Sequence, residues 1–290
     1  EKAAISAEQR TAIHAVRPDL AGAAMVLRAD GWDCLAIEVD GLTVFKIPHH
    51  DAAIGRLCKE PATLDLIRPH TALALPKMRL HEAPILMTEH RKVLGEAVDE
   101  AAYGAMAGPV RAQLADDLAR FFAAIHGVAP EAVWAADCDG LRPWPDGEAL
   151  LKRLDGRVGP TTMAQAERTV AAHARHGPDE IVFGQFDTHG WNMAFDVRAG
   201  RLHGLFDFAG AGIGELHRDL SYPFFVSADL ARQVVARYAA ISGRDVDFAR
   251  VADAHGYLRV IELCDELDGP EPVTRFEAAL ARYCDIRCTI

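Results

Sequence analysis

The chain lacks the features of a membrane or secreted protein. None of its apolar runs approaches the roughly 20 residues that a helix needs to cross a bilayer, and no repeat or low-complexity tract interrupts its 290 residues. Its first residues, Glu-Lys-Ala-Ala-Ile-Ser, contain no apolar segment of the kind found in a signal peptide. We therefore expect a cytoplasmic globular protein without a membrane partner, built as one large domain or as two lobes around a cleft.

Motifs for two common kinds of site are also absent. The six cysteines form no Cys-x-x-Cys pair and have no zinc-ligand spacing with the histidines, so we expect reduced thiols and no zinc centre. The chain has no Gly-x4-Gly-Lys-Ser/Thr sequence. This argues against a P-loop nucleotide site.

Basic residues are in the minority. The chain has 31 Lys and Arg against 42 Asp and Glu, a formal net charge of −11. Such a balance disfavours the phosphate contacts that hold nucleic acid, so no nucleic-acid partner is expected. The same charge favours a cationic small molecule as ligand.

The densest chemical signal lies between Gln185 and Gly212. Asp187 and Asn192 stand five positions apart, and Asp207 follows at the end of a second apolar run. This pattern is typical of phosphoryl-transfer enzymes, in which one Asp orients the attacking hydroxyl while an Asn and a later Asp hold Mg²⁺. Carboxylate and amide oxygens suit Mg²⁺, which shares its ligands with substrate phosphates. The plainer alternative makes Asp187 a loop carboxylate and Asp207 a strand-end residue.

A β-hairpin is predicted to bring these side chains together. Residues 193–196 and 201–206 are short apolar-rich runs, and the intervening segment ends in Gly200. A hairpin returns the chain on itself, so Asp207 at the end of its second strand should lie beside Asn192 at the start of its first. The carboxylates and the amide would then converge on one cation.

The other predicted elements follow the order of a two-lobed α+β protein. We expect a mainly β N-lobe at residues 1–89 and a mainly α C-lobe at residues 90–290. Lys46, between Phe45 and Ile47, is predicted to point to the ligand side of the sheet. A kink in the helix, or a new helix with Pro61 in its first turn, is expected at Pro61. The predicted strands are 25–28, 34–39, 42–47 and 84–89, followed by a connector at 90–95, and the predicted helices are 6–16, 51–67, 109–128, 164–176, 229–241, 248–268 and 273–284.

At these positions the chain resembles the aminoglycoside phosphotransferase family, protein-kinase-like enzymes that phosphorylate antibiotics and small metabolites. Gln185-Phe-Asp-Thr-His-Gly-Trp-Asn192 is similar to the family's His-Gly-Asp-x4-Asn, and Leu205-Phe-Asp-Phe is similar to its Ile-Asp-Phe. The stretch from Gly212 to Leu220 is similar to its glycine-rich tail ending in Asp-Leu. Residues 118–126 are similar to its helix ending in Leu-His.

The resemblance implies a bilobal protein-kinase-like fold and a role for each matching residue. Asp187 would accept or orient the substrate hydroxyl, and Asn192 and Asp207 would bind Mg²⁺. Asp219 would brace the catalytic loop. The co-substrate would be ATP or GTP. Lys46, paired with Glu60, would hold its phosphates, and the loop at Gly31 and Trp32 would cover them. The backbone of Thr88 and His90 would contact the purine.

Two departures from the family pattern leave alternatives open. Gln185 replaces a supporting histidine, although glutamine can also donate and accept hydrogen bonds. Pro61 next to Glu60 makes Asp51 or Asp65 alternative partners for Lys46. These departures motivate a second hypothesis, a catalytically silent kinase-like binding module. A protein kinase is a third, disfavoured because no Ala-Pro-Glu segment follows the catalytic loop.

The acceptor is the least legible part of the sequence. His189 is a competing candidate base, but the spacing to Asn192 favours Asp187. Our prediction is a nucleoside-triphosphate-dependent phosphotransferase that acts on a hydroxyl of a small molecule, with a cationic one such as an aminoglycoside favoured. A pocket for its ammonium groups would be formed by Glu262, Asp265, Glu266 and Asp268, with an aromatic wall of Trp191 and Tyr257. The alternative is that the acids lie on a solvated face and that the two aromatic residues pack in the core.

Overall fold

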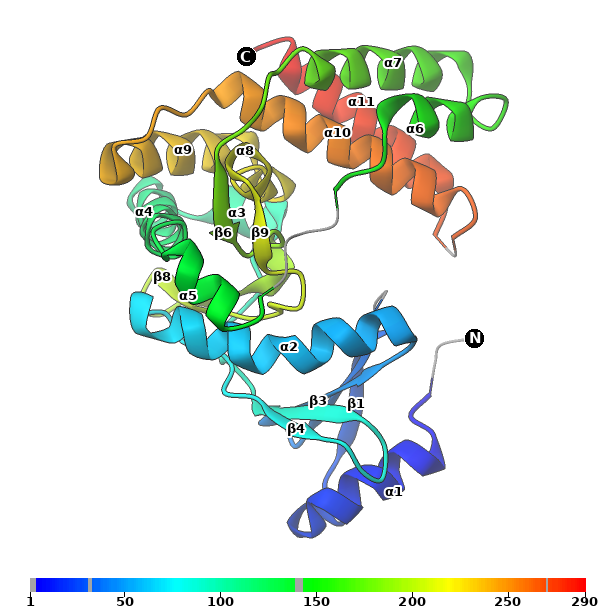
Figure 1. Ribbon diagram of the computed structural model, residues 1–290, viewed down its shortest axis with the longest axis vertical. Coiled ribbons are helices and arrows are strands. Elements are labelled where there is room, and N and C mark those ends of the chain that lie inside the picture. Colours follow the sequence, from blue (N-terminus) through cyan, green and yellow to red (C-terminus); the bar gives the residue numbers. More distant parts are fainter. Residues whose placement is uncertain (1–3, 31–32, 139–142, 270) are drawn as a thin grey trace.

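A computed structural model describes residues 4–30, 33–138, 143–269 and 271–290 of the chain. A small lobe built on an antiparallel sheet lies at one end of the long axis, and a larger, mainly helical lobe lies at the other (Figure 1). This bilobal α+β arrangement confirms the predicted fold class. No helix in the described part of the chain is both long and apolar enough to cross a membrane. All six cysteines carry free thiols.

The N-lobe sheet has five antiparallel strands in the order β1-β2-β3-β5-β4. Asp40 and Gly41 join the second strand to the third with φ of 49° and 72°, the left-handed conformation that a type I′ turn needs. The sequence analysis missed β4 and placed β5 too early. The strand bounds are β1 Met25–Asp30, β2 Cys34–Val39, β3 Thr43–Pro48, β4 Arg79–His81 and β5 Met87–Arg91.

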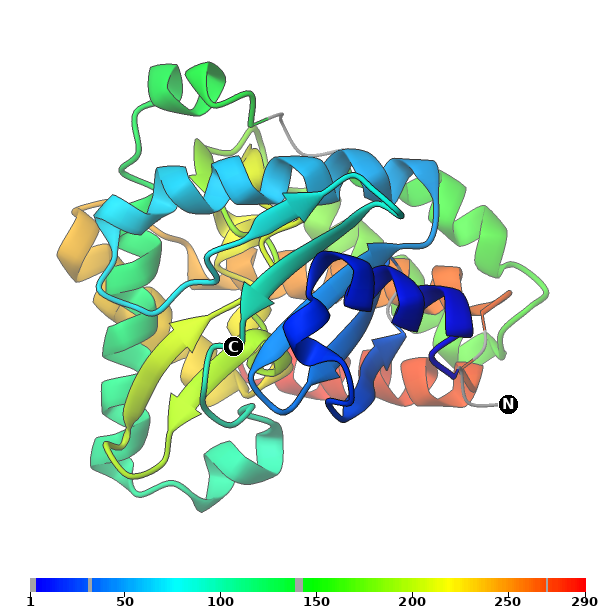
Figure 2. The same cartoon turned by 90° about the horizontal axis from the view of Figure 1, so that it is seen from below.

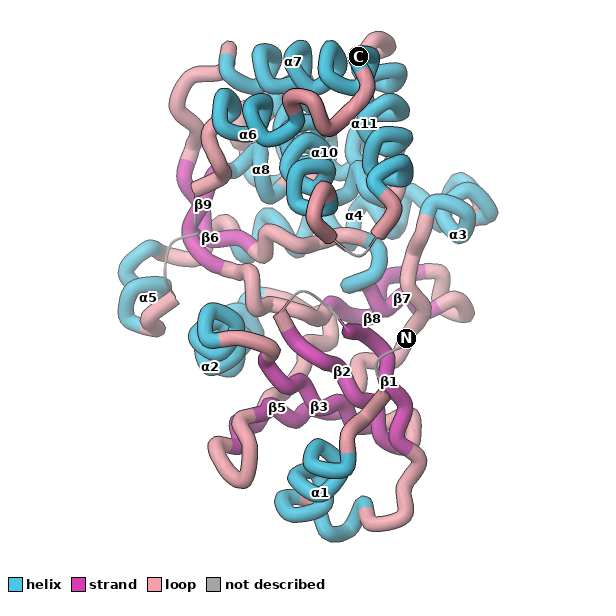
Figure 3. Tube along the Cα trace, turned by 90° about the vertical axis from the view of Figure 1, so that its right-hand side faces the viewer, coloured by secondary structure: helices cyan, strands magenta, loops and turns pink. Residues whose placement is uncertain are grey.

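One face of this sheet is covered by helix α1, Ala7–Val16 (Figures 2 and 3). The helix begins at Ser6, which forms a capping box. Its Ile13 belongs to the same buried cluster as Phe45 of β3. Because side chains alternate along a strand, Lys46 points to the opposite face, as predicted, and that face lies toward the second lobe.

Helix α2, Asp51–Ile67, continues through Pro61 as one helix, so no new helix begins there and that alternative of the prediction is wrong. A proline inside a helix removes a backbone hydrogen bond and costs roughly 3 kcal/mol. Tertiary contacts hold the helix at this point. Leu64 is buried in the main core, and the buried carboxylate of Glu60 accepts a hydrogen bond from Phe208 N at 2.8 Å.

The C-lobe helices form two packed groups (Figures 1 and 3). One group centres on α4 and α9, and the predicted apolar side of α4 is buried throughout, at Leu114, Leu118, Phe121, Phe122 and Ile125. The other group contains α6, α7, α10 and α11. The helix bounds are α3 Glu100–Ala105, α4 Gly108–Ile125, α5 Pro130–Ala135, α6 Gly147–Leu154, α7 Pro160–Ala174, α8 Leu216–Asp219, α9 Ala228–Ser242, α10 Phe248–Glu266 and α11 Val273–Arg287.

Two small antiparallel strand pairs complete the C-lobe. β7, Met193–Asp196, pairs with β8, Arg201–Leu205, and forms the predicted hairpin. β6, Ile181–Gly184, pairs with β9, Gly212–Glu215, a pairing that the sequence analysis missed. The C-lobe also contains short 3₁₀ helices, η3 at Gly190–Asn192 immediately before β7 and η4 at Tyr222–Phe225 between α8 and α9.

Candidate active site

Two loops lie side by side between these strand pairs. The first, residues 185–192, connects β6 to β7, and the second, residues 206–211, connects β8 to β9. Strand pairing at both ends therefore fixes the spacing of the loops. Phe206 N donates a hydrogen bond to Asn192 O at 3.1 Å. Asp207 consequently follows a residue that is bonded to Asn192, as the hairpin argument required.

Asp187 is held by two polar neighbours from its own loop. Asn192 Nδ2 donates to Asp187 Oδ2 at 2.8 Å and to the Asp187 backbone O at 2.9 Å. His189 Nε2 lies 3.2 Å from Asp187 Oδ1. Burial raises the pKa of the Asp187 carboxyl, and the attraction of His189 and the hydrogen bond from Asn192 only partly offset this rise. A raised pKa makes the carboxylate a better proton acceptor than an exposed Asp.

Gln185 supports both loops at once. The residue is fully buried, and its Nε2 donates to the backbone O of Phe206 at 3.1 Å and of Asp207 at 3.2 Å. Its Oε1 accepts from Thr188 Oγ1 at 2.7 Å. Glutamine therefore makes the bridging hydrogen bonds of a supporting side chain at the position where the resemblance implied histidine.

Asp219 braces the first loop through its backbone. Its carboxylate accepts hydrogen bonds from Gln185 N at 3.2 Å and from Phe186 N, and His126 Nε2 donates to it at 2.9 Å. Phe186 has a φ of 57°, which is uncommon for a residue with a side chain. The buried carboxylate thus fixes an unfavourable backbone conformation immediately before Asp187.

Lys46 bridges the two lobes. Its Nζ donates to Glu60 Oε2 at 2.8 Å and to Asp207 Oδ1 at 3.0 Å, so the predicted Lys46–Glu60 pair is present and neither Asp51 nor Asp65 replaces Glu60. Burial lowers the pKa of Lys46, but the attraction of the two carboxylates outweighs it and the pKa is raised overall. Burial likewise opposes ionisation of Asp207, yet Lys46 holds the pKa of this carboxyl below its ordinary value.

A cavity of about 580 Å³ lies beside these charged groups, between the lobes. Its volume is within the range of sites for small molecules and cofactors. The wall combines charged and apolar side chains. Among its lining residues are Lys46, Asn192 and Asp207, together with Val44, Met78, Val93 and Met193.

Thr88 and His90, which were expected to face a purine from the connector, lie in strand β5 instead. His90 lines the cavity, whereas Thr88 is fully buried and does not. Both belong to β5, because this strand stays paired with β3 as far as Arg91. The connector therefore starts at Lys92, and its cavity-lining residues are Lys92, Val93, Gly95 and Ala97.

Charged residues that the sequence analysis did not single out border the same cavity. Glu38 accepts hydrogen bonds from Arg28 Nη2 at 2.5 Å and from Lys92 Nζ at 2.6 Å. The alternation of β2, with apolar residues facing α1, is the signal that places Glu38 on the cavity face. Gly31 and Trp32, which were predicted to cover the phosphates, lie outside the described residues.

The oxygen atoms near Asp207 fit a magnesium ion. Asn192 Nδ2 makes the contacts to Asp187 and His189, and within the described part of the chain no hydrogen bond uses Asn192 Oδ1. Asp207 lines the cavity with its side chain 44% exposed. In the described part of the chain, no three His, Cys, Asp or Glu side chains form a metal site of their own. An amide and a carboxylate that leave room for phosphates and water are the ligands that Mg²⁺ uses in such enzymes.

The acids predicted to form an ammonium pocket do not gather at the site. Among the described residues, only Glu262 of the four borders the loop of Asp187, and there it is bound to Arg259 at 2.9 Å. The other three are engaged elsewhere: Asp265 with Arg153, Asp268 with Arg157, and Glu266 with the backbone N of Glu271.

The predicted aromatic wall is also not formed. Trp191 is 55% exposed and lines the cavity near Asn192. Tyr257 is buried, stacks on Trp144 with ring centroids 5.5 Å apart, and donates to Pro145 O at 2.6 Å. It therefore contributes to packing in a different part of the C-lobe.

Comparisons with known proteins agree with this geometry. No curated protein matches the chain. The GDP complex of wild-type aminoglycoside 2′-phosphotransferase-IIIa superposes with a TM-score of 0.80 at 18% identity, covering 97% of each chain. The macrolide 2′-phosphotransferase MphH from Brachybacterium faecium gives a TM-score of 0.64 at 19% identity, covering 93% of this chain and 97% of that chain. At these identities the structures show a shared kinase-like fold.

The sequence shows the family of this chain, in addition to its fold. A profile of the phosphotransferase enzyme family matches residues 11–254, which include the N-lobe sheet, both loops of the candidate site and most of the C-lobe. This chain therefore belongs to the phosphotransferase enzyme family.

Proposed function

We propose that this protein transfers the terminal phosphoryl group of a nucleoside triphosphate to a hydroxyl of a small molecule. The observation that carries the proposal is the juxtaposition of Asp187, bonded to Asn192, with Asp207, bonded to Lys46. Phosphoryl transfer needs mainly positioning and charge neutralisation, and these groups supply both.

The nucleotide would occupy the cavity between the lobes. In this proposal residues 1–89 cover the nucleotide, and residues 90–290 carry the catalytic loop and the acceptor site. Lys46 would bind the α- and β-phosphates, held in place by Glu60. Relatives with this fold have been solved with GDP and with ATP, which supports a nucleotide co-substrate of either kind. Such a co-substrate also accords with the expected cytoplasmic location.

Asn192 Oδ1 and Asp207 would hold Mg²⁺. When bound, the ion would neutralise charge on the transferring phosphoryl group and on the phosphates that leave. The chain's own contribution is to fix the two oxygens. Asn192 is oriented by its bonds to Asp187, and Asp207 is oriented by Lys46 and by the contact of Gln185 with its backbone.

Asp187 would receive the proton of the acceptor hydroxyl. As the acceptor oxygen bonds to the γ-phosphorus, the bond from this phosphorus to the bridging β–γ oxygen breaks, and the nucleoside diphosphate leaves. The raised pKa of Asp187 favours proton uptake at that moment. His189, the competing candidate for the base, is bonded to Asp187 and is better placed to orient it.

Gln185 and Pro61 motivated the hypothesis of a catalytically silent protein, but their positions in the fold do not support it. Gln185 bridges the two loops, and Glu60 reaches Lys46 despite Pro61. We propose a small molecule with a hydroxyl group as the acceptor. Two relatives were solved with kanamycin and gentamicin, but a cationic acceptor would need unpaired acids near Asp187, and Glu262 there is paired with Arg259.

Transfer of label from γ-labelled ATP or GTP tests the proposal. The purified chain is incubated with Mg²⁺ and a panel of neutral, anionic and cationic hydroxyl compounds, and the products are separated by chromatography. We expect a labelled, phosphorylated acceptor. Tight nucleotide binding without transfer to any acceptor, and without slow hydrolysis to labelled phosphate, would instead support the silent binding module.

A further inference from the structure

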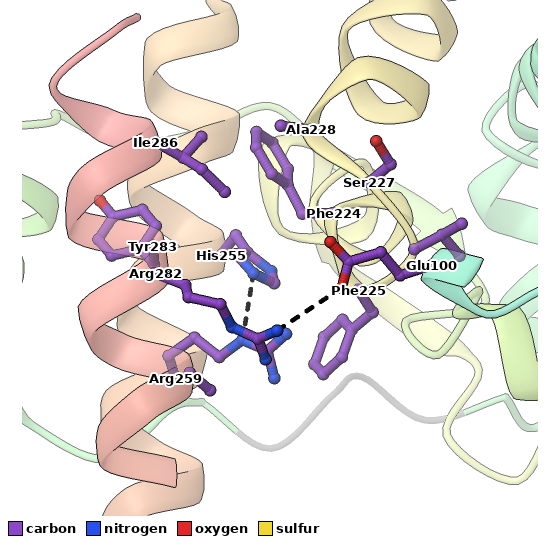
Figure 4. A pocket seen from close by; sticks show the side chains of 12 residues that line it. Glu100, Phe224, Phe225, Ser227, Ala228, His255, Arg259, Arg282, Tyr283 and Ile286 are labelled. Carbon is purple, nitrogen blue, oxygen red and sulfur yellow. Dashed lines mark hydrogen bonds and ion pairs between the residues drawn. The ribbon is translucent and has the colours of Figure 1, made fainter. Parts of the chain in front are cut away.

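A groove separates the Asp187 loop from the C-terminal helix pair α10 and α11. It consists of two adjoining hollows of about 280 and 210 Å³, which share Phe225, Arg259 and Arg282 in their walls. Gly190 and Trp191 of the catalytic loop line the larger hollow. The smaller one, shown in Figure 4, extends along α10 and α11.

Arginine is the prevailing basic residue of this groove. Arg259, Arg275 and Arg282 line the larger hollow together with three acids. The acids are poor ligands for an ammonium group. Asp99 caps α3 by accepting from Ala102 N at 2.7 Å, the side chain of Glu100 is 77% exposed, and Glu262 is bound to Arg259.

Arg259 is held in place by its neighbours, and part of its guanidinium group makes no hydrogen bond to the described residues. Its guanidinium lies 4.0 Å from the ring centroid of Phe225. Its Nε donates to His255 Nε2 at 3.2 Å, and its Nη1 donates to Glu262 Oε2 at 2.9 Å. Its Nη2 makes no hydrogen bond to any residue in the described part of the chain. A pre-positioned guanidinium with unused donors is well suited to an oxyanion such as carboxylate or phosphate.

His255 provides a second unused donor in the same wall. Because its Nε2 accepts from Arg259, the neutral ring carries its proton on Nδ1. That nitrogen is buried and has no partner among the residues that the structure describes. The ring is only 4% exposed and lines the smaller hollow. Buried donors without acceptors are uncommon in folded proteins, and an anionic ligand supplies acceptors.

Ring contacts connect Arg259 to the reacting carboxylate. The Phe225 ring beneath Arg259 lies 5.9 Å, centroid to centroid, from the ring of His189. His189 in turn contacts Asp187. An acceptor that lies in the groove with one end at Arg259 would extend toward the loop of Asp187, whose Gly190 and Trp191 line the larger hollow.

We propose that the acceptor carries an anionic oxygen group, a carboxylate or a phosphate, in addition to its hydroxyl, and that Arg259 binds this group. Arg282 lines both hollows at the rim of the groove, where it forms an ion pair with Glu100 at 3.6 Å. This inference rests on the proposed phosphotransfer, because it names the substrate class of that reaction. It replaces the cationic acceptor that the net charge of the whole chain favoured.

The first experiment compares acceptors that share a carbon framework and differ in the charged group that they carry. Glucose, glucuronate, glucose 6-phosphate and glucosamine share one ring, and glycerol, glycerate, glycerol 3-phosphate and serinol form a second set. We expect kcat/KM for an anionic member to exceed that of its neutral and cationic counterparts by about tenfold or more. The two anionic members distinguish carboxylate from phosphate. Preference for glucosamine, serinol or kanamycin would overturn the inference.

The second experiment does not depend on finding a substrate. Inorganic phosphate and malonate are titrated by calorimetry into protein saturated with Mg²⁺ and a non-hydrolysable ATP analogue, so that the nucleotide site is filled. We expect Arg259→Gln to weaken binding of one of these anions by about tenfold. The control Arg157→Gln removes an equal charge at Asp268, away from the groove, and should bind like the unaltered protein.

Equal anion affinity in Arg259→Gln and the control, or no anion binding to the unaltered protein, would overturn the inference. Affinity for the ATP analogue and the melting temperature are measured for each variant. Retained nucleotide binding with lost anion binding separates a defect in the groove from a failure of the proposed phosphotransfer.

Discussion

Asn192 Nδ2 lies 2.8 Å from Asp187 Oδ2 and donates a hydrogen bond to it. The same bond turns Asn192 Oδ1 away from the carboxylate, so in our proposal one side chain both orients the base and would offer an oxygen to Mg²⁺. Replacement by alanine should therefore impair two steps. We expect Asn192→Ala to lower kcat by about 100-fold and to raise the Mg²⁺ concentration needed for half-maximal rate.

Asn192→Asp is the matched variant, since it keeps an oxygen ligand and loses the donor. It should require less Mg²⁺ than Asn192→Ala while kcat stays low. Both are measured by steady-state kinetics over a Mg²⁺ titration. Identical Mg²⁺ dependence in the two variants and in the unaltered enzyme would remove Asn192 from the metal site.

The Lys46–Glu60 pair predicts a charge effect on nucleotide binding. Glu60→Gln keeps an acceptor for Phe208 N but removes the charge that holds Lys46. With only Asp207 left to position it, Lys46 should bind phosphates less well, and the Kd for ATP or GTP should rise about tenfold. Calorimetry provides the measurement.

Asp65→Asn is the control for this substitution. Asp65 lies on the same helix, is exposed and pairs only weakly with Arg68 at 3.7 Å. Its nucleotide Kd should be unchanged. A larger loss in Asp65→Asn than in Glu60→Gln would mean that the wrong acid of α2 has been assigned to Lys46.

Gln185 connects stability to activity. Gln185→Leu leaves Thr188 Oγ1 and the backbone oxygens of Phe206 and Asp207 without their partner in a buried setting. We expect the free energy of unfolding to fall by about 3 kcal/mol and kcat to fall with it. Gln185→His, which restores the residue of the family pattern, should lose far less of both. Urea denaturation and steady-state kinetics check the pair, and equal behaviour of the two variants would contradict the bridging role.

His255 predicts a pH dependence of stability. Burial, and to a smaller extent the charge of Arg259, lower its pKa well below the ordinary value, so the ring is neutral in the fold. A depressed histidine pKa means that the unfolded chain takes up the proton first as the pH falls. The stabilising contribution is therefore complete above about pH 6.5 and is lost below it at about 1.4 kcal/mol per pH unit.

The measurement is the difference between the unaltered protein and His255→Gln in urea denaturation at pH 7.5, 6.5 and 5.5. Glutamine does not titrate, and its Oε1 can accept from Arg259. The unaltered protein should lose stability more steeply than the variant below pH 6.5. Parallel curves would show that His255 titrates normally in the fold.

Parts of the site that depend on short-range chain geometry could be predicted from the sequence. The Asp187–Asn192 spacing and the hairpin that returns Asp207 lie within one compact segment, so local patterns were sufficient. The inward direction of Lys46 followed from strand alternation. Its pair with Glu60 came from the family resemblance, and the structure shows it.

Other parts depend on partners far away in the chain. Arg153 pairs with Asp265, and Arg157 pairs with Asp268, each across more than a hundred positions of the sequence. A local sequence pattern cannot predict such pairs. The β6–β9 pair involves a glycine-rich strand without apolar alternation. Pro61 carried the usual signal for a helix end, but the packing of α2 and the buried Glu60 outweighed it.

Asp187→Asn tests the central claim most directly. The substitution preserves size and keeps one oxygen that can accept from Asn192 Nδ2, but it removes the proton acceptor. We therefore predict a fall in γ-phosphoryl transfer of about 1,000-fold or more, with a Kd for Mg²⁺-nucleotide within about threefold of the unaltered enzyme. Both quantities are measured on the same preparation, by single-turnover transfer and by calorimetry. Transfer at the unaltered rate in Asp187→Asn would contradict the account.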